Sequence, residues 1–120
     1  MDADPMSYEV SLLKHVYARF NARDMESVLA AMSEDVAWAN GMEGGHVRGR
    51  DGVRDYWTRQ WAVLNPHVEP VGFSTGLEGE VVVDVHQVVH DVEGKLLVDQ
   101  MVVHIFRFED GLIRRFDIGG

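Results

Sequence analysis

The segment from Met101 to Asp117, MVVHIFRFEDGLIRRFD, constrains the fold of this chain more than any other stretch. Two strand-like runs flank Asp110-Gly111, a dipeptide favoured in β-hairpin turns. Successive side chains of a strand point to opposite faces. One face of the first run therefore carries a histidine among apolar residues: Val102, His104, Phe106 and Phe108. We expect that face to be the wall of a core or of a cavity.

Before this hairpin, the pattern predicts three helices. Asp4-Pro5 is typical of a helix start, and apolar residues then recur every three or four positions as far as Phe20. Asp24 predicts the cap of a second, short helix. A third helix is expected over about 50–64, because Trp57 and its apolar neighbours form one stripe and Asn65-Pro66 stops the helix.

The remaining segments predict strands, over 36–40, 67–77, 80–91 and 96–109, with a glycine-rich loop over 41–49. The run 80–91 is rich in valine on both faces, so both faces should be covered. Helices can cover one, and we expect a second subunit to cover the other, giving a homodimer through the sheet. The predicted fold class is α+β, a single domain over 1–120. It is a cone-shaped, curved antiparallel sheet around three N-terminal helices, with an apolar pocket between them.

Composition excludes several classes of protein. The chain has 120 residues, the usual size of one domain, and no cysteine, which excludes disulfides and thiol catalysis. Its formal net charge of −9 argues against nucleic acid and membrane partners. No apolar run reaches the ~18 residues of a membrane span. The segment MDADPMSYEV lacks the pattern of a signal peptide, so we expect a cytoplasmic protein.

Four motifs then point to a known family: Phe20-Asn21-Ala22-Arg23-Asp24, Ser33-Glu34-Asp35-Val36, Gly49-Arg50-Asp51-Gly52-Val53 and Phe106-Arg107-Phe108-Glu109-Asp110-Gly111-Leu112-Ile113. With them the chain resembles the nuclear transport factor 2-like superfamily over nearly its whole length. Within it, the nearest branch is that of SnoaL-like polyketide cyclases and ketosteroid isomerases. The resemblance implies a deep apolar pocket and dimerisation through the sheet. The superfamily includes isomerases, cyclases, dehydratases and epoxide hydrolases, so its fold does not specify the reaction.

The resemblance to ketosteroid isomerase implies positions for a base and a hydrogen-bond donor. The aspartate base of that enzyme falls at Asn40, and its protonated aspartate falls at His104. Its tyrosine falls at about Val16, next to Tyr17. Asparagine cannot be a general base, because its amide does not take up a proton at neutral pH. Steroid isomerisation by that mechanism is therefore not expected.

The resemblance to SnoaL-like cyclases is closer. Those cyclases carry a pocket histidine on the strand that corresponds to the one with His104, and an acid/base aspartate near the position of Asp117. If Phe116 and Ile118 face the pocket, however, Asp117 faces away from it. Epoxide hydrolases have an aromatic-x-Asn motif that Trp38-Ala39-Asn40 resembles, but the arginine they need is missing from the expected face.

We predict catalytic roles for His104, Asn40 and His86. The histidines would move protons, since the unperturbed pKa of histidine, ~6.5, is close to working pH, while Asn40 and Tyr17 would bind a carbonyl oxygen. The other predicted substrate contacts form the pocket wall together with Tyr17: Trp38, Trp57, Phe106, Phe116 and Ile118.

Each catalytic candidate has a structural alternative. His104 could be a half-buried histidine bonded to a backbone carbonyl, and Asn40 could pin the end of its strand. The face of the strand that carries Asp84, His86 and His90 is either pocket wall or outer sheet surface.

No cofactor or metal site is expected. His86 and His90 are four residues apart on a strand, about 13 Å, too far to share one ion. Two function classes follow from the pocket. One is an isomerase- or cyclase-like enzyme acting on a small apolar carbonyl compound of polyketide or terpenoid type. The other is a non-catalytic binding module for a lipophilic small molecule.

Overall fold

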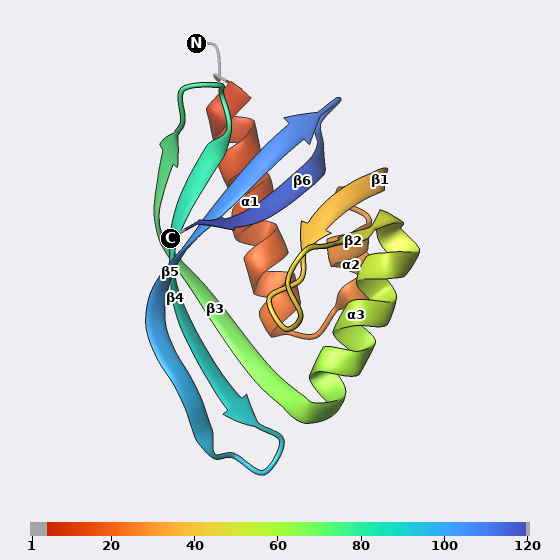
Figure 1. Ribbon diagram of the computed structural model, residues 1–120. Coiled ribbons are helices and arrows are strands. Elements are labelled where there is room, and N and C mark those ends of the chain that lie inside the picture. The colour runs from red at the N-terminus through yellow and green to blue at the C-terminus, as the bar shows by residue number, and fades with distance from the viewer. Residues whose placement is uncertain (1–4, 120) are drawn as a thin grey trace.

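The computed structural model describes residues 5–119 of the chain, and its side chains from Tyr8 onward. Three helices and six strands follow one another as α1 (Pro5–Asn21), α2 (Met25–Leu29), β1 (Met32–Ala39), β2 (His46–Arg48), α3 (Gly49–Val63), β3 (Leu64–Thr75), β4 (Val81–Asp91), β5 (Leu96–Glu109) and β6 (Leu112–Gly119) (Figure 1). Within this part of the chain no helix is long and apolar enough to span a membrane.

The six strands form one curved, open sheet in the order β2-β1-β6-β5-β4-β3. Helices α1 and α3 lie on the same side of it (Figure 1). The α+β class and the helix-covered curved sheet are confirmed. One neighbouring pair differs from the expected antiparallel arrangement, because β1 and β6 run parallel, with Trp38 opposite Phe116. Parallel pairing is possible here because a long crossover, including α3, separates the two strands in the sequence.

Three element boundaries differ from the sequence prediction. Ser33-Glu34-Asp35, which precedes the strand expected over 36–40, lies inside β1, and β2 lies within the expected glycine-rich loop. β3 begins at Leu64, directly after α3. Long-range hydrogen bonds fix the start of β1. The amide of Ile113 donates to the carbonyl of Ala31 at 2.9 Å, and the guanidinium of Arg50 donates to the carbonyl of Met32 at 3.0 Å. The strand propensity of the local sequence could not predict this start, because the bonding partners lie far away in the chain.

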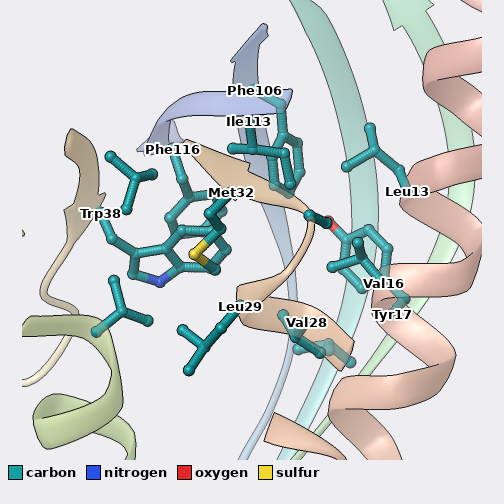
Figure 2. Close-up of a cluster of buried hydrophobic side chains, with 14 of the residues drawn as sticks. Leu13, Val16, Tyr17, Val28, Leu29, Met32, Trp38, Phe106, Ile113 and Phe116 are labelled. Atoms are coloured by element: carbon teal, nitrogen blue, oxygen red, sulfur yellow. The ribbon is translucent and has the colours of Figure 1, made fainter. Parts of the chain in front are cut away.

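The core is an aromatic and aliphatic layer between the helices and the inner face of the sheet. Figure 2 shows Tyr17 extending from α1 toward the aromatic side chains on the strands. Trp38 stacks on Phe116 with ring centroids 4.2 Å apart, and meets Trp57 of α3 edge-on at 5.3 Å. Phe106 is 1% exposed. These aromatic contacts hold α3 to the centre of the sheet.

The inner and outer faces of β4 are clearly separated. Val81, Val83 and Val85 are fully buried under the helices. The outer face, which we define as the face turned away from the helices, carries half-buried apolar residues next to Met101, which is 58% exposed: Val82, Val88, Val103 and Ile105. An apolar strip on an open sheet face favours a partner surface.

The dimer expected from the sequence therefore remains a prediction, and the outer face gives its test. The wild-type chain is expected to sediment at twice its mass of 13.5 kDa at micromolar concentration. Met101→Glu should shift it toward monomer, because a buried unpaired carboxylate opposes association. Leu77→Glu is the matched control, since Leu77 is fully exposed in the β3–β4 connection. A wild-type monomer would contradict the prediction.

Candidate functional site

A cavity of about 420 Å³ lies between the helices and the inner face of the sheet. This volume is within the range of small-molecule sites, roughly 300–1,000 Å³. Its wall is mostly apolar and, among the described residues, includes no Asp, Glu, Lys or Arg side chain. Apart from the indole N–H groups of its tryptophans, the polar side chains of the wall are one histidine, two tyrosines and three glutamines: His104, Tyr17, Tyr56, Gln60, Gln87 and Gln100.

All six side chains predicted to contact a substrate lie in this wall: Tyr17, Trp38, Trp57, Phe106, Phe116 and Ile118. Alternation brings three of them together with His104. His104 pairs with Ile118 across the β5–β6 ladder, and Phe106 pairs with Phe116 two residues further along β5. Tyr17 and Trp57 reach the same space from α1 and α3.

His104 forms one specific hydrogen bond within the cavity wall. Its Nδ1 lies 2.7 Å from the hydroxyl oxygen of Tyr17, which is 87 residues away in the sequence. The imidazole is 7% exposed and is enclosed by aromatic rings, with the centroid of Phe116 at 4.8 Å. Within the described chain Nε2 of His104 has no protein partner, so it is available to a ligand.

Burial decides the charge of this pair. Desolvation lowers the pKa of His104 from its usual 6.5 to about 4, because a buried imidazolium loses its hydration. Burial also raises the pKa of Tyr17 above its usual range. Both groups are therefore neutral at pH 7, and one proton lies between them in the 2.7 Å hydrogen bond. Either the phenol donates to Nδ1, or the Nδ1 proton is donated to the phenol oxygen.

Asn40, which was predicted to bind a carbonyl oxygen, is not among the residues of the cavity wall. Its Oδ1 accepts from the amides of Met42 at 3.0 Å and Glu43 at 2.9 Å. The side chain thus closes the turn after β1, which is the structural alternative considered from the sequence. The side chain that hydrogen-bonds to His104 is Tyr17.

His86 also lies away from His104, on the outer face of β4. Its Nε2 is 2.6 Å from Oδ1 of Asp99 on β5, and its side chain is 45% exposed. Asp117 is on the outer face too, where it contacts His46 and Arg115. The alternation of Asp117 with Phe116 and Ile118 predicted this orientation. Side chains alternate along β4, and the neighbours of His86, Val85 and Gln87, point inward. His86 therefore points outward.

Sequence reasoning missed several polar residues of the wall. Tyr56 and Gln60 lie on the cavity side of α3, and Gln87 and Gln100 face each other across β4 and β5 with an amide contact of 3.1 Å. A signal for Tyr56 existed, because Val53, Tyr56, Trp57 and Gln60 follow the spacing of one helix face. Among the described residues, no three His, Asp or Glu side chains come close enough to hold a metal ion.

The sequence matches the model of the SnoaL-like domain family over residues 13–116. The chain belongs to the SnoaL-like domain family. Curated proteins include no significant match to this SnoaL-like domain.

Solved structures share its fold. An NTF2-like protein of unknown function from Burkholderia pseudomallei K96243 is 28% identical, covering 93% of this chain and 89% of its own, with a TM-score of 0.82. TerC, crystallised with polyporic acid, is 26% identical over 93% of this chain and 90% of its own, with a TM-score of 0.81. A candidate polyketide cyclase from Pseudomonas putida KT2440 is 18% identical, covering 91% of this chain and 88% of its own, with a TM-score of 0.79. At this identity the likeness supports a shared fold only.

Proposed function

We propose that this SnoaL-like domain is an enzyme of the isomerase or cyclase type. It would transfer a proton on a small apolar carbonyl compound bound in the cavity, without a cofactor. The observation that carries the proposal is the contact of 2.7 Å between Tyr17 and Nδ1 of His104 in an apolar wall, while Nε2 has no hydrogen-bond partner among the described residues. An imidazole with one nitrogen fixed and the other free to meet a ligand has the arrangement of a positioned acid/base.

The proton transfer can be balanced without forming an ion. In one tautomer Nδ1–H donates to the Tyr17 oxygen, so Nε2 holds a lone pair and the Tyr17 hydroxyl can donate to a ligand carbonyl. Nε2 takes a proton from the carbon next to the carbonyl, while Nδ1 gives its proton to Tyr17. Tyr17 gives its own proton to the carbonyl oxygen. The product is an enol, and His104 ends neutral in its other tautomer.

The environment of the pair supports this neutral relay. The same burial that lowers the pKa of His104 to about 4 makes a free imidazolium intermediate costly. A relay that returns each proton within one step avoids that charge. In the reverse direction, the relay returns a proton to the enol. If that proton is added to a different carbon, a double bond has moved, which is an isomerisation.

TerC gives a reason to choose the first ligand. It is 26% identical to this chain and has been crystallised with polyporic acid. We extend to this chain only the expectation that its cavity takes a small organic molecule. Polyporic acid and the ketone 1-tetralone are the compounds to test, the second because it has exchangeable hydrogens next to its carbonyl.

Binding should be visible in tryptophan emission. Trp38 and Trp57 line the cavity, whereas Trp61 does not. A ligand in the cavity should therefore change the emission in a saturable manner. Trp61→Phe should preserve most of that change, and Trp57→Phe should reduce it, with both variants checked by circular dichroism. If neither compound gives a saturable change in the wild-type protein, the cavity does not bind such ligands and the proposal fails.

A second candidate function is a binding protein for a lipophilic small molecule. The absence of any carboxylate from the described cavity wall favours it, because many acid/base sites pair a histidine with a carboxylate. Incubation with 1-tetralone in D2O separates the two. An enzyme of the proposed type incorporates deuterium next to the carbonyl faster than buffer does, as followed by NMR. A binding protein gives a fluorescence change with no faster exchange.

A further inference from the structure

Tyr56 is a second polar group in the cavity wall, separate from the pair of Tyr17 and His104. It extends from α3 and is 4% exposed. Its hydroxyl oxygen accepts from the amide of Gly41 at 3.1 Å and from Nε2 of Gln60 at 3.2 Å. Both partners donate to it, so its acceptor capacity is already used.

The proton of this hydroxyl has no acceptor among the described residues. Burial raises the pKa of Tyr56, so the hydroxyl keeps its proton at neutral pH. A buried donor without an acceptor costs roughly 1–3 kcal/mol, and a group in a cavity wall avoids this cost when a ligand or water accepts from it. Tyr56, Gly41 and Gln60 all border the cavity, so an acceptor for this proton can lie there.

Ile118 relates this hydroxyl to His104. A Cβ added to Gly41 would lie 3.5 Å from Cδ1 of Ile118 and 3.7 Å from the Tyr56 oxygen, so the hydroxyl is near the end of that side chain. Ile118 is in turn the ladder partner of His104. Apart from the glutamine pair of β4 and β5, the cavity therefore has two polar places near Ile118, one at His104 and Tyr17 and one at Tyr56.

We infer that Tyr56 donates a hydrogen bond to a second oxygen of the ligand, and that this selects carbonyl compounds carrying another oxygen on the far side of an apolar ring system. This inference rests on the proposed function, because it assumes that the carbonyl group binds at His104. Tyr56 is then a specificity residue. The free hydroxyl proton favours an oxygen acceptor over a hydrocarbon edge, since an apolar edge would leave that proton unpaired.

The test compares 1-tetralone with its 5-, 6- and 7-hydroxy isomers by isothermal titration calorimetry. In the wild-type protein at least one isomer should bind on the order of tenfold more tightly than 1-tetralone, the usual gain from pairing one buried hydrogen-bonding group. Tyr56→Phe, which removes only the hydroxyl oxygen, should abolish that gain while leaving 1-tetralone binding nearly unchanged. Gln60→Met is the matched control, because it removes a donor to Tyr56 but keeps the hydroxyl, so the gain should persist.

The outcomes distinguish this inference from the proposed function. If 1-tetralone binds and exchanges deuterium, but no hydroxy isomer binds more tightly, Tyr56 does not select a second oxygen. The same conclusion follows if the gain survives in Tyr56→Phe. If the gain disappears in Tyr56→Phe and persists in Gln60→Met, the inference stands, whether or not deuterium is exchanged. If no tetralone binds at all, the inference fails, and the proposed function fails with it when polyporic acid does not bind either.

Discussion

Replacing His104 by glutamine is expected to lower the rate of deuterium incorporation into 1-tetralone by about a hundredfold or more, while binding of the ketone should be largely kept. The physical reason is that the glutamine amide can hydrogen-bond to Tyr17 but cannot take a proton from carbon. The measurement is exchange in D2O followed by NMR, with the dissociation constant obtained separately from tryptophan fluorescence. An exchange rate equal to that of the wild type would make His104 a wall residue only.

Two further variants serve as comparisons for His104→Gln. His86→Gln changes a histidine on the outer face, which contacts Asp99, and should leave exchange unchanged. Tyr17→Phe removes the hydroxyl that bonds Nδ1, so in the neutral relay it should slow exchange about as severely as His104→Gln. A large loss in His104→Gln with little loss in Tyr17→Phe would exclude the relay, leaving a simple base.

The pH dependence of exchange follows from the same burial. His104 must be neutral to accept a proton, and its pKa is lowered to about 4. The catalysed rate should therefore remain level from pH 7 to about 5 and fall close to tenfold per pH unit below about 4. A decline centred near the usual histidine value of 6.5 would show that the imidazole is solvated.

The second large effect concerns stability in acid. In the unfolded chain the imidazole of His104 takes up a proton near pH 6.5, whereas in the folded chain it does so only near pH 4. Between these values the unfolded state binds more protons, so the free energy of unfolding falls as the pH falls. The contribution of His104 is fully present above pH 6.5 and lost by about pH 4. A shift of this size corresponds to about 3 kcal/mol.

Urea unfolding of the wild type and of His104→Gln, measured at several pH values from 7 to 4, isolates this contribution. The two proteins differ only at position 104, so only the difference between their two stabilities is assigned to His104. The wild type should lose about 3 kcal/mol relative to the variant over this range. A difference that stays constant with pH would mean that His104 is protonated as easily in the folded state as in the unfolded one.

The local sequence pattern was sufficient to predict the fold of this protein and the face on which several side chains lie. The alternation in MVVHIFRFEDGLIRRFD places His104 and Phe106 on one face, and puts Phe116 on the same face as Ile118. This follows because the two-residue period of a strand is a property of the backbone itself. The motifs in the same stretch and in the helices also indicated the SnoaL-like family.

The identity of the site depended on contacts that no local pattern encodes. The sequence determined that His104 faces an apolar wall, but only the packing of α1 against the sheet decided that its partner is Tyr17. The face of His86 likewise depends on strand register, whereas Asn40 is bonded locally, within its own turn. Hydrogen-bond partners far apart in the chain are chosen by how helices pack on the sheet, because one turn of a helix or one residue of register redirects every side chain.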